Sequence, residues 1–232
     1  FRSVLSDEKA LTMEQGLAST LDSSSAVRSW GAFYTKSTTL YNEEGGSADV
    51  SIVGAEDDAR MTEYFTFRTR VGHDPIPFEE DSVILTEKTA LNLGLSVGDT
   101  FYVEAADGSR VPLTLTGIAE NYMFTRLYLS GAQLESLLGG TPEWNTVYGL
   151  TGCATEAEYN ALRTKLLGCN YVSSVSFTED TTSMIGSLIG SLIGSLNYVV
   201  VLIIVCAAAL AAVVLYNLIS VNLAERKKEL AT

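Results

Sequence analysis

A long uncharged and strongly apolar segment near the C-terminus dominates the pattern of hydrophobic and polar positions. No charged residue occurs between Asp180 and Glu225, and the stretch 199–215 contains nothing more polar than Cys206. A run of about 18 or more apolar residues is the signature of a helix that spans a membrane. The pattern therefore predicts a transmembrane helix at 198–220.

The residues at the two ends of this run indicate its position and orientation in a membrane. Tyr198 and Tyr216 flank the run, and at ~1.5 Å per residue they lie ~27 Å apart along a helix, which suits the two membrane interfaces. Basic residues follow one end only, and they are Arg226, Lys227 and Lys228. Because the cytoplasmic side carries the excess of Lys and Arg, we expect a cytoplasmic C-terminus and an extracellular body of about 195 residues.

A repeat of glycine and serine precedes the span, at 181–197. Gly186, Gly190 and Gly194 recur every fourth residue, and each is followed by serine. Glycines at this spacing form one small-residue stripe on a helix, which lets a second helix approach closely. We interpret the segment as a stalk helix that continues into the membrane. The alternative is a flexible Gly/Ser linker, although the large apolar residues between the glycines are untypical of one.

The first 180 residues show a mixture of strand-like and helix-like patterns, and we expect an extracellular α+β domain there. Strands are expected at 32–41, 48–53, 63–70, 83–85, 100–105, 111–118, 126–129, 146–150 and 172–177, and helices at 7–21, 87–93, 132–138 and 155–167. We expect Thr86 to cap the helix at 87–93, and Glu156 and Glu158 to lie in the first turn of the helix at 155–167. The dipeptide Asp107-Gly108 predicts a hairpin turn between two of the strands. The last strand, helix and strand resemble a split βαβ unit.

Composition and charge exclude several classes of function. The chain has 232 residues, 47% of them hydrophobic, and a net charge of −13. A body this acidic does not bind nucleic acid by neutralising phosphates. The sequence has no phosphate-binding loop of the Walker type and no clustered metal ligands, and its single histidine, His73, is too isolated for a catalytic triad. We therefore expect neither catalytic residues nor a cofactor nor a bound metal.

Two of the three cysteines lie in the expected extracellular domain. Cys153 and Cys169 flank the helix expected at 155–167. An oxidising compartment allows a disulfide between them, but the helix must fold back for the two sulfurs to meet. The sequence leaves the bridged and the free state open.

Two regions of the sequence resemble FtsX-like permeases, of the macrolide-exporter and lipoprotein-releasing type. The stretch 82–100, SVILTEKTALNLGLSVGDT, is similar to a helix followed by a Gly-Asp turn in the extracellular domains of that family, and 114–122 and 128–130 are similar to the strands that follow. The stretch 213–232, VVLYNLISVNLAERKKELAT, resembles the place where a spanning helix of the family leaves the membrane through an Asn-containing turn into a charged helix. Residues 1–81 contain no motif of the family and resemble it only in the order of their expected helices and strands.

The resemblance implies a segment of an ABC transporter permease, with no enzymatic activity of its own. ATP would be hydrolysed by a separate ATPase on the cytoplasmic face, bound through a coupling helix that begins at 221–232. Glu225, Arg226 and Glu229 would be the residues that contact it. The permease would be dimeric, its other spanning helices would pack against this one, and its cargo would be a peptide, a lipid or another amphiphile. We thus expect the chain to be part of a longer, multi-pass protein of the cell membrane.

A single-pass sensor is the alternative interpretation. Its extracellular domain would bind a ligand, and the glycine stripe would be the face of a homodimer. Further spanning helices in the full-length protein would exclude it.

Overall fold

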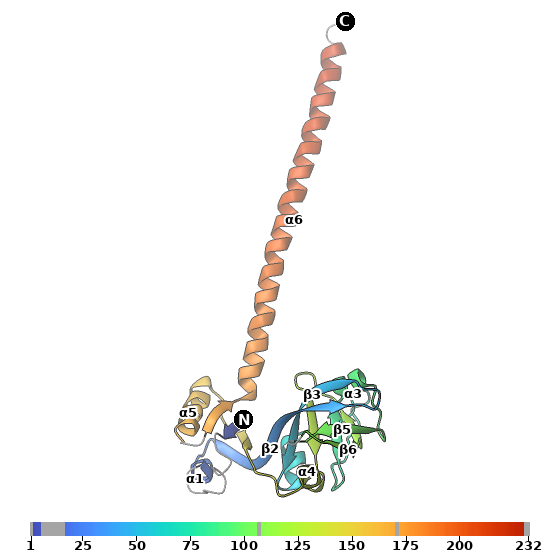
Figure 1. Ribbon diagram of the computed structural model, residues 1–232. Coiled ribbons are helices and arrows are strands. Elements are labelled where there is room, and N and C mark those ends of the chain that lie inside the picture. Colours follow the sequence, from blue (N-terminus) through green and yellow to red (C-terminus); the bar gives the residue numbers. More distant parts are fainter. Residues whose placement is uncertain (1, 6–16, 106–107, 170–171, 230–232) are drawn as a thin grey trace. The chain divides into compact units, whose positions relative to one another are not determined.

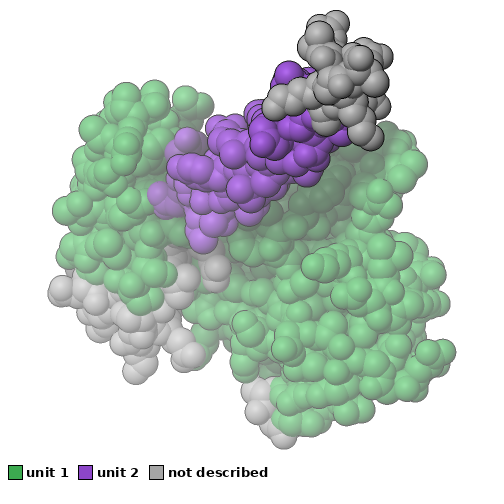
Figure 2. Space-filling view, turned by 90° about the horizontal axis from the view of Figure 1, so that it is seen from above, with its two compact units in different colours: residues 1–177 green, residues 178–232 purple. Residues whose placement is uncertain are grey.

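The computed structural model describes residues 2–5, 17–105, 108–169 and 172–229. The chain divides into two compact units, residues 1–177 and 178–232 (Figures 1 and 2). The first unit contains strands and short helices, and the second is a single long helix. The α+β class expected for the body is confirmed, with a long apolar helix after it.

Ten strands form one sheet within the described residues. The strands are β1 (Arg2–Leu5), β2 (Val27–Tyr41), β3 (Ser47–Ala55), β4 (Val83–Thr86), β5 (Thr100–Glu104), β6 (Arg110–Thr114), β7 (Gly117–Ala119), β8 (Arg126–Leu129), β9 (Thr146–Thr151) and β10 (Val172–Ser176). The helices are α1 (Leu17–Asp22), α2 (Asp58–Tyr64), α3 (Glu87–Leu93), α4 (Gly131–Leu138), α5 (Glu156–Leu167) and α6 (Thr178–Glu229). The order across the sheet is β10-β1-β9-β2-β3-β8-β4-β7, and β5 and β6 branch from β2.

The long strand β2 connects two regions of the first unit (Figure 1). Its first half pairs with β9 and its second half with β3, and both pairings are antiparallel. A small apolar core that includes Leu21, Leu162 and Leu166 lies between α1, α5 and the first half. The main core, with Leu40 and Phe101 among its fully buried members, lies along the second half. One continuous strand therefore belongs to both cores.

The C-terminal part of the first unit is a split βαβ unit, as expected. Both β9 and β10 pair antiparallel with β1, which lies between them, so they run parallel to each other. Helix α5 connects them. It begins with a capping box, in which the Thr155 hydroxyl accepts from the Glu158 backbone N–H and the Glu158 carboxylate accepts from the Thr155 N–H.

The strand predicted at 63–70 is wrong. The Asp57 carboxylate accepts from the backbone N–H of Ala59 and caps α2, which extends to Tyr64. The remaining residues are irregular, and a single bridge joins Arg68 to Pro75. The alternation of polar and aromatic residues suggested a strand, but Phe67 is buried in an aromatic cluster instead.

The strand predicted at 111–118 is two strands rather than one. Strand β6 forms the expected hairpin with β5, whereas β7 leaves it and pairs parallel with β4. Thr116 makes the break, because its backbone N–H and its hydroxyl both bond to Val83. Gly117 follows, and a Cβ there would lie 2.8 Å from Cγ2 of Ile76, so no larger residue fits without movement.

Two further expectations are met in part. Thr86 occupies the N-cap of α3 without a capping side-chain hydrogen bond, because its hydroxyl meets that of Thr89 and accepts from the Arg126 N–H. Of the helix predicted at 7–21, residues 7–16 lie outside the described residues, and α1 forms the rest. The first two residues of the predicted hairpin turn, 106 and 107, also lie outside them.

Candidate functional site

Helix α6 is the feature of this chain most directly related to a membrane. It has 52 residues, which corresponds to a length of ~78 Å at 1.5 Å per residue. By length and composition its residues Thr178–Leu223 can cross a membrane, and none of its most apolar window is buried inside the protein. The hydrocarbon core of a bilayer is ~30 Å thick, so more than half of the helix extends beyond one crossing.

The segment 199–215 of α6 is apolar on all sides. Large apolar side chains are exposed from Met184 to Leu223, for example Leu188 (54%), Ile203 (61%) and Leu215 (59%). Burying one such side chain is worth ~1.5–3 kcal/mol, so water is an unfavourable surrounding for this helix. A helix that is apolar all round needs lipid or other helices around it.

Several hydroxyl groups along the first part of α6 bond to carbonyl groups of the helix itself. Thr182 donates to the carbonyl of Thr178, and Ser195 donates to that of Ser191. Ser187 likewise donates to the carbonyl of Met184. These hydroxyls require no external partner, so they are compatible with an apolar surrounding.

The predicted glycine stripe is open along its whole length. A Cβ built on Gly186, Gly190 or Gly194 meets no atom within 4 Å. The segment is helical at all three positions. No described residue of this chain occupies the stripe, so a helix that packs there has to come from another chain or from residues outside those described. The packing role of the three glycines remains a prediction.

Charged residues lie at both ends of α6. Glu179 and Asp180 lie in the first turn, where acidic side chains interact favourably with the helix dipole. Glu225, Arg226 and Glu229 lie in the last turns of the helix, but their side chains lie outside those that the structure describes. Their predicted contact with an ATPase therefore stays a prediction.

Cys153 and Cys169 lie near one small core. Both are half-buried free thiols, and both pack against the cluster that contains Leu162 and Leu166. The Cys169 thiol is 3.8 Å from the hydroxyl of Thr20. A disulfide between Cys153 and Cys169, which the sequence leaves open, therefore stays a hypothesis.

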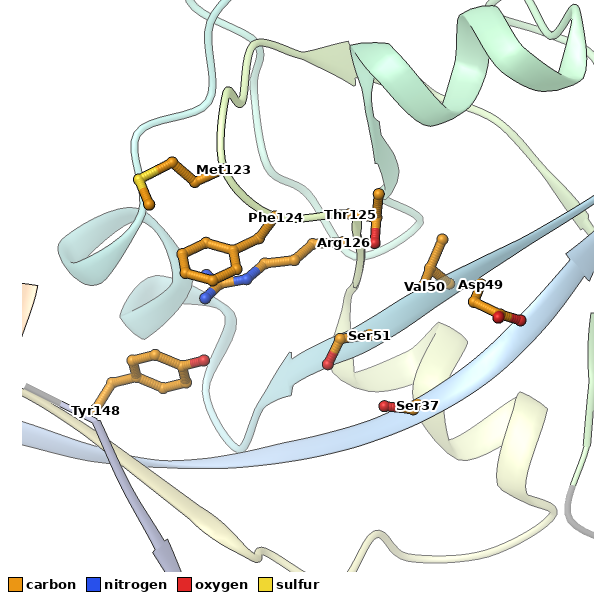
Figure 3. Close-up of a pocket in the computed structure, with 9 residues that line it drawn as sticks. All are labelled: Ser37, Asp49, Val50, Ser51, Met123, Phe124, Thr125, Arg126 and Tyr148. Carbon is orange, nitrogen blue, oxygen red and sulfur yellow. The ribbon is translucent and has the colours of Figure 1, made fainter. Parts of the chain in front are cut away.

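The first unit also contains a cavity that the sequence does not predict (Figure 3). It has a volume of about 320 Å³ and lies where β2 and β3 meet the loop before β8. The residues that line it are Ser37, Asp49, Val50, Ser51, Met123, Phe124, Thr125, Arg126 and Tyr148. They come from four separate parts of the sequence, so no local motif indicates them. The available signal was three successive large apolar residues, Tyr122 to Phe124, in an expected loop.

Arg126 is the one cation among the residues that line this cavity. Its guanidinium carbon lies 4.8 Å from the centre of the Phe124 ring and 5.9 Å from that of Tyr148. Next to it, burial raises the pKa of the Tyr128 hydroxyl, and the charge of Arg126 opposes this with a smaller lowering effect. The cavity thus combines a positive charge with aromatic surface.

Comparisons with known proteins find similarity in solved structures. No protein-family model matches the sequence, and no curated relative matches it. The chain is similar to the periplasmic region of MacB from Actinobacillus actinomycetemcomitans, with 12% identity and a TM-score of 0.46 over 80% of this chain and 91% of that one. It is also similar to the extracellular domain of the noncanonic ABC-type transporter YknZ from Gram-positive bacteria, with 17% identity and a TM-score of 0.45 over 75% of this chain and 98% of that one.

Proposed function

We propose that this chain is the part of an ABC transporter permease that carries ATPase-driven movement across the membrane to an extracellular domain. The observation that carries the proposal is the continuity of α6, which runs for 52 residues from the end of the first unit to the charged C-terminal segment. An uninterrupted helix is stiff along its axis, so a displacement at one end reaches the other.

The direction of the helix follows from its flanks. Arg226, Lys227 and Lys228 mark the cytoplasmic end, and the acidic body lies outside. A single helix such as α6 forms no channel for cargo. The movement therefore changes the conformation of the extracellular domain or its contacts with partners. Cargo is then expelled from outside the membrane. The resemblance to FtsX-like permeases supports a peptide, a lipid or another amphiphile as that cargo.

The proposed partners follow from the same features. A cytoplasmic ABC ATPase binds near Glu225, Arg226 and Glu229, and it supplies the ATP hydrolysis that this chain lacks. Other helices of a dimeric permease pack on the glycine stripe, and lipid covers the remaining apolar surface of α6.

The experiment replaces Glu225 and Glu229 together by alanine in the full-length permease. The basic topology signal is unchanged, so the protein should insert normally. We expect the variant to lose co-purification with the ATPase and the stimulation of its activity. The matched control replaces the acidic pair at the other end of α6, Glu179 and Asp180, and should keep both properties.

Normal binding and stimulation in the Glu225 and Glu229 variant would remove these two carboxylates from the coupling mechanism. If no ATPase co-purifies with the unmodified full-length protein, the proposal of an ABC permease itself is wrong.

A further inference from the structure

The cavity beside Arg126 has features of a binding site that the proposed transport role does not use. It belongs entirely to the first unit and is separate in sequence from α6. Its volume of about 320 Å³ is at the lower end of the range for small-molecule pockets. Figure 3 shows the guanidinium of Arg126 between the rings of Phe124 and Tyr148.

The position of Arg126 is fixed by its backbone and by aromatic rings. It is the first residue of β8, it pairs with Ser51 of β3, and its N–H donates to the hydroxyl of Thr86 over 3.2 Å. Besides Phe124 and Tyr148, the ring of Phe65 lies 5.6 Å from the guanidinium carbon. Cation–π attraction to these rings holds the guanidinium beside them.

No carboxylate of the described residues forms an ion pair with Arg126. Other arginines of the body do have such partners, for example Arg70 with Glu87 at 2.7 Å. Asp49 also lines the cavity, but it accepts a hydrogen bond from Thr39. Arg126 is therefore a cation that backbone pairing and aromatic rings hold in a cavity, and its guanidinium is available to bind an external anion.

The other groups around the cavity restrict the kind of anion. The Asp49 carboxylate is a second charge in the same cavity, and it disfavours a ligand with two negative charges such as phosphate. The rim is apolar, since Met123 and Phe124 are about half exposed (49% and 51%). This rim is held by the Asn121 side chain, whose oxygen accepts from the backbone N–H groups of both residues. A single negative charge on an apolar ligand fits best.

The backbone next to the cavity offers a further contact. Strand β8 begins opposite Ser51, so the preceding residues of β3, Ser47 to Val50, extend past it. None of the described strands pairs with β3 on that side at these residues. A strand edge without a partner strand can accept an extended peptide through backbone hydrogen bonds.

We propose that this cavity binds the C-terminal carboxylate of a peptide whose last residue is apolar or aromatic. The guanidinium of Arg126 forms two parallel hydrogen bonds with the carboxylate, the geometry for which arginine is suited. The terminal side chain packs on Met123 and Phe124. The preceding backbone follows the free edge of β3, and Ser37 and Ser51 supply hydroxyls to it.

The experiment is a calorimetric titration of the full chain in lipid nanodiscs. The probes are acetyl-Ala-Val-Phe with a free carboxylate, the same peptide with a C-terminal amide, and inorganic phosphate. We expect the acid to bind at least tenfold more tightly than either the amide or phosphate. Equal affinities for acid and amide would overturn the proposal, and so would phosphate binding as tight as that of the acid.

Variants assign the effect to Arg126. Arg126→Gln should remove the preference for the acid, and Arg126→Lys should keep only part of it, because lysine cannot form the paired hydrogen bonds. The matched control is Arg110→Gln, since Arg110 also stacks on an aromatic ring, Tyr41 at 3.8 Å, but lies outside the cavity. An unchanged preference in a folded Arg126→Gln protein would overturn the assignment, with folding checked by the thermal unfolding midpoint. The comparison of acid and amide in the unmodified chain needs no variant, and it stands whether or not α6 couples to an ATPase.

Discussion

Replacing Gly190 by leucine tests whether the glycine stripe of α6 packs against another helix. The substitution places a large side chain at the centre of the stripe, between Gly186 and Gly194. If a partner helix lies on the stripe, the leucine forces it away. If nothing lies there, the leucine adds one more apolar side chain to a surface that is already apolar.

The substitution should change the free energy in opposite directions in the two cases. Within the chain, a Cβ at Gly190 meets no atom within 4 Å, so the substitution causes no internal clash. Leucine also stabilises a helix by ~0.8 kcal/mol relative to glycine. A partner packed closely on the stripe reverses this, because overpacking a well-packed contact costs ~1–3 kcal/mol. We therefore expect the association of the helices to weaken by about tenfold, which corresponds to ~1.4 kcal/mol, while the body stays folded.

The assay is ATPase stimulation by the full-length permease in liposomes, together with thermal unfolding of the body. Gly190→Leu should reduce stimulation without lowering the unfolding temperature. Gly190→Ala is the graded control, since it adds one carbon only. Leu192→Ala is the control for position, because residue 192 lies ~200° around the helix from Gly190. Full stimulation with Gly190→Leu would mean that the stripe is only a local bias in composition.

The remaining predictions concern the body and the topology. Thr155→Ala should lower the free energy of unfolding by ~1 kcal/mol in a urea titration, because it removes the N-cap hydroxyl of α5; an unchanged midpoint would contradict the capping box. The backbone N–H groups of Ala154 and Thr155, followed by the Thr155 hydroxyl, lower the pKa of the Glu158 carboxyl. Its contribution to stability is therefore fully present above the unfolded pKa and is lost as pH falls through the lower folded pKa, so Glu158→Gln should destabilise the protein at neutral pH and progressively less in acid. Phe33→Ala should cost ~3–5 kcal/mol, because this ring is fully buried and contacts three other aromatic rings; a cost below ~1 kcal/mol would show that the cluster repacks. In a chain whose native cysteines are replaced, a cysteine at position 109 should react with an impermeant reagent on intact cells and one at position 228 should not, and the reverse pattern would invert the topology.

The elements that the sequence predicted well are those whose signals are local. The block from β4 to α3 begins with four buried residues and ends at Gly94, which has a φ of 66° as a helix C-cap. Helix α5 was indicated by acidic residues in its first turn and a threonine before them, and the structure shows these groups in a capping box. In both cases the residues that define the element also stabilise its ends, so a short window of sequence is sufficient.

The error at 63–70 has the opposite cause. Its aromatic residues alternate as in a strand, yet Phe65 and Phe67 are placed by rings that are distant in the sequence, such as Tyr128 and Tyr148. A contact between parts of the chain that are more than sixty residues apart leaves no local pattern. The signal that was overlooked is Asp57, which caps α2 and marks a helix start just before the region.

The two candidate sites also differ in how well the sequence predicts them: α6 is predicted and the cavity is not. The membrane explains the first case. A segment in lipid has to satisfy its backbone hydrogen bonds internally, so a long apolar run has essentially one structure available, the helix. The role proposed for α6 could therefore be argued from sequence before its structure was known. No such constraint acts on the cavity, where the strand pairing of Ser51 with Arg126 and that of Ala32 with Val147 bring β3, β8 and β9 to one place. The role proposed for Arg126 cannot be read from the sequence, where it is one of 15 basic residues. In the structure it lines the cavity, lies near three aromatic rings and forms no ion pair with a carboxylate of the described residues.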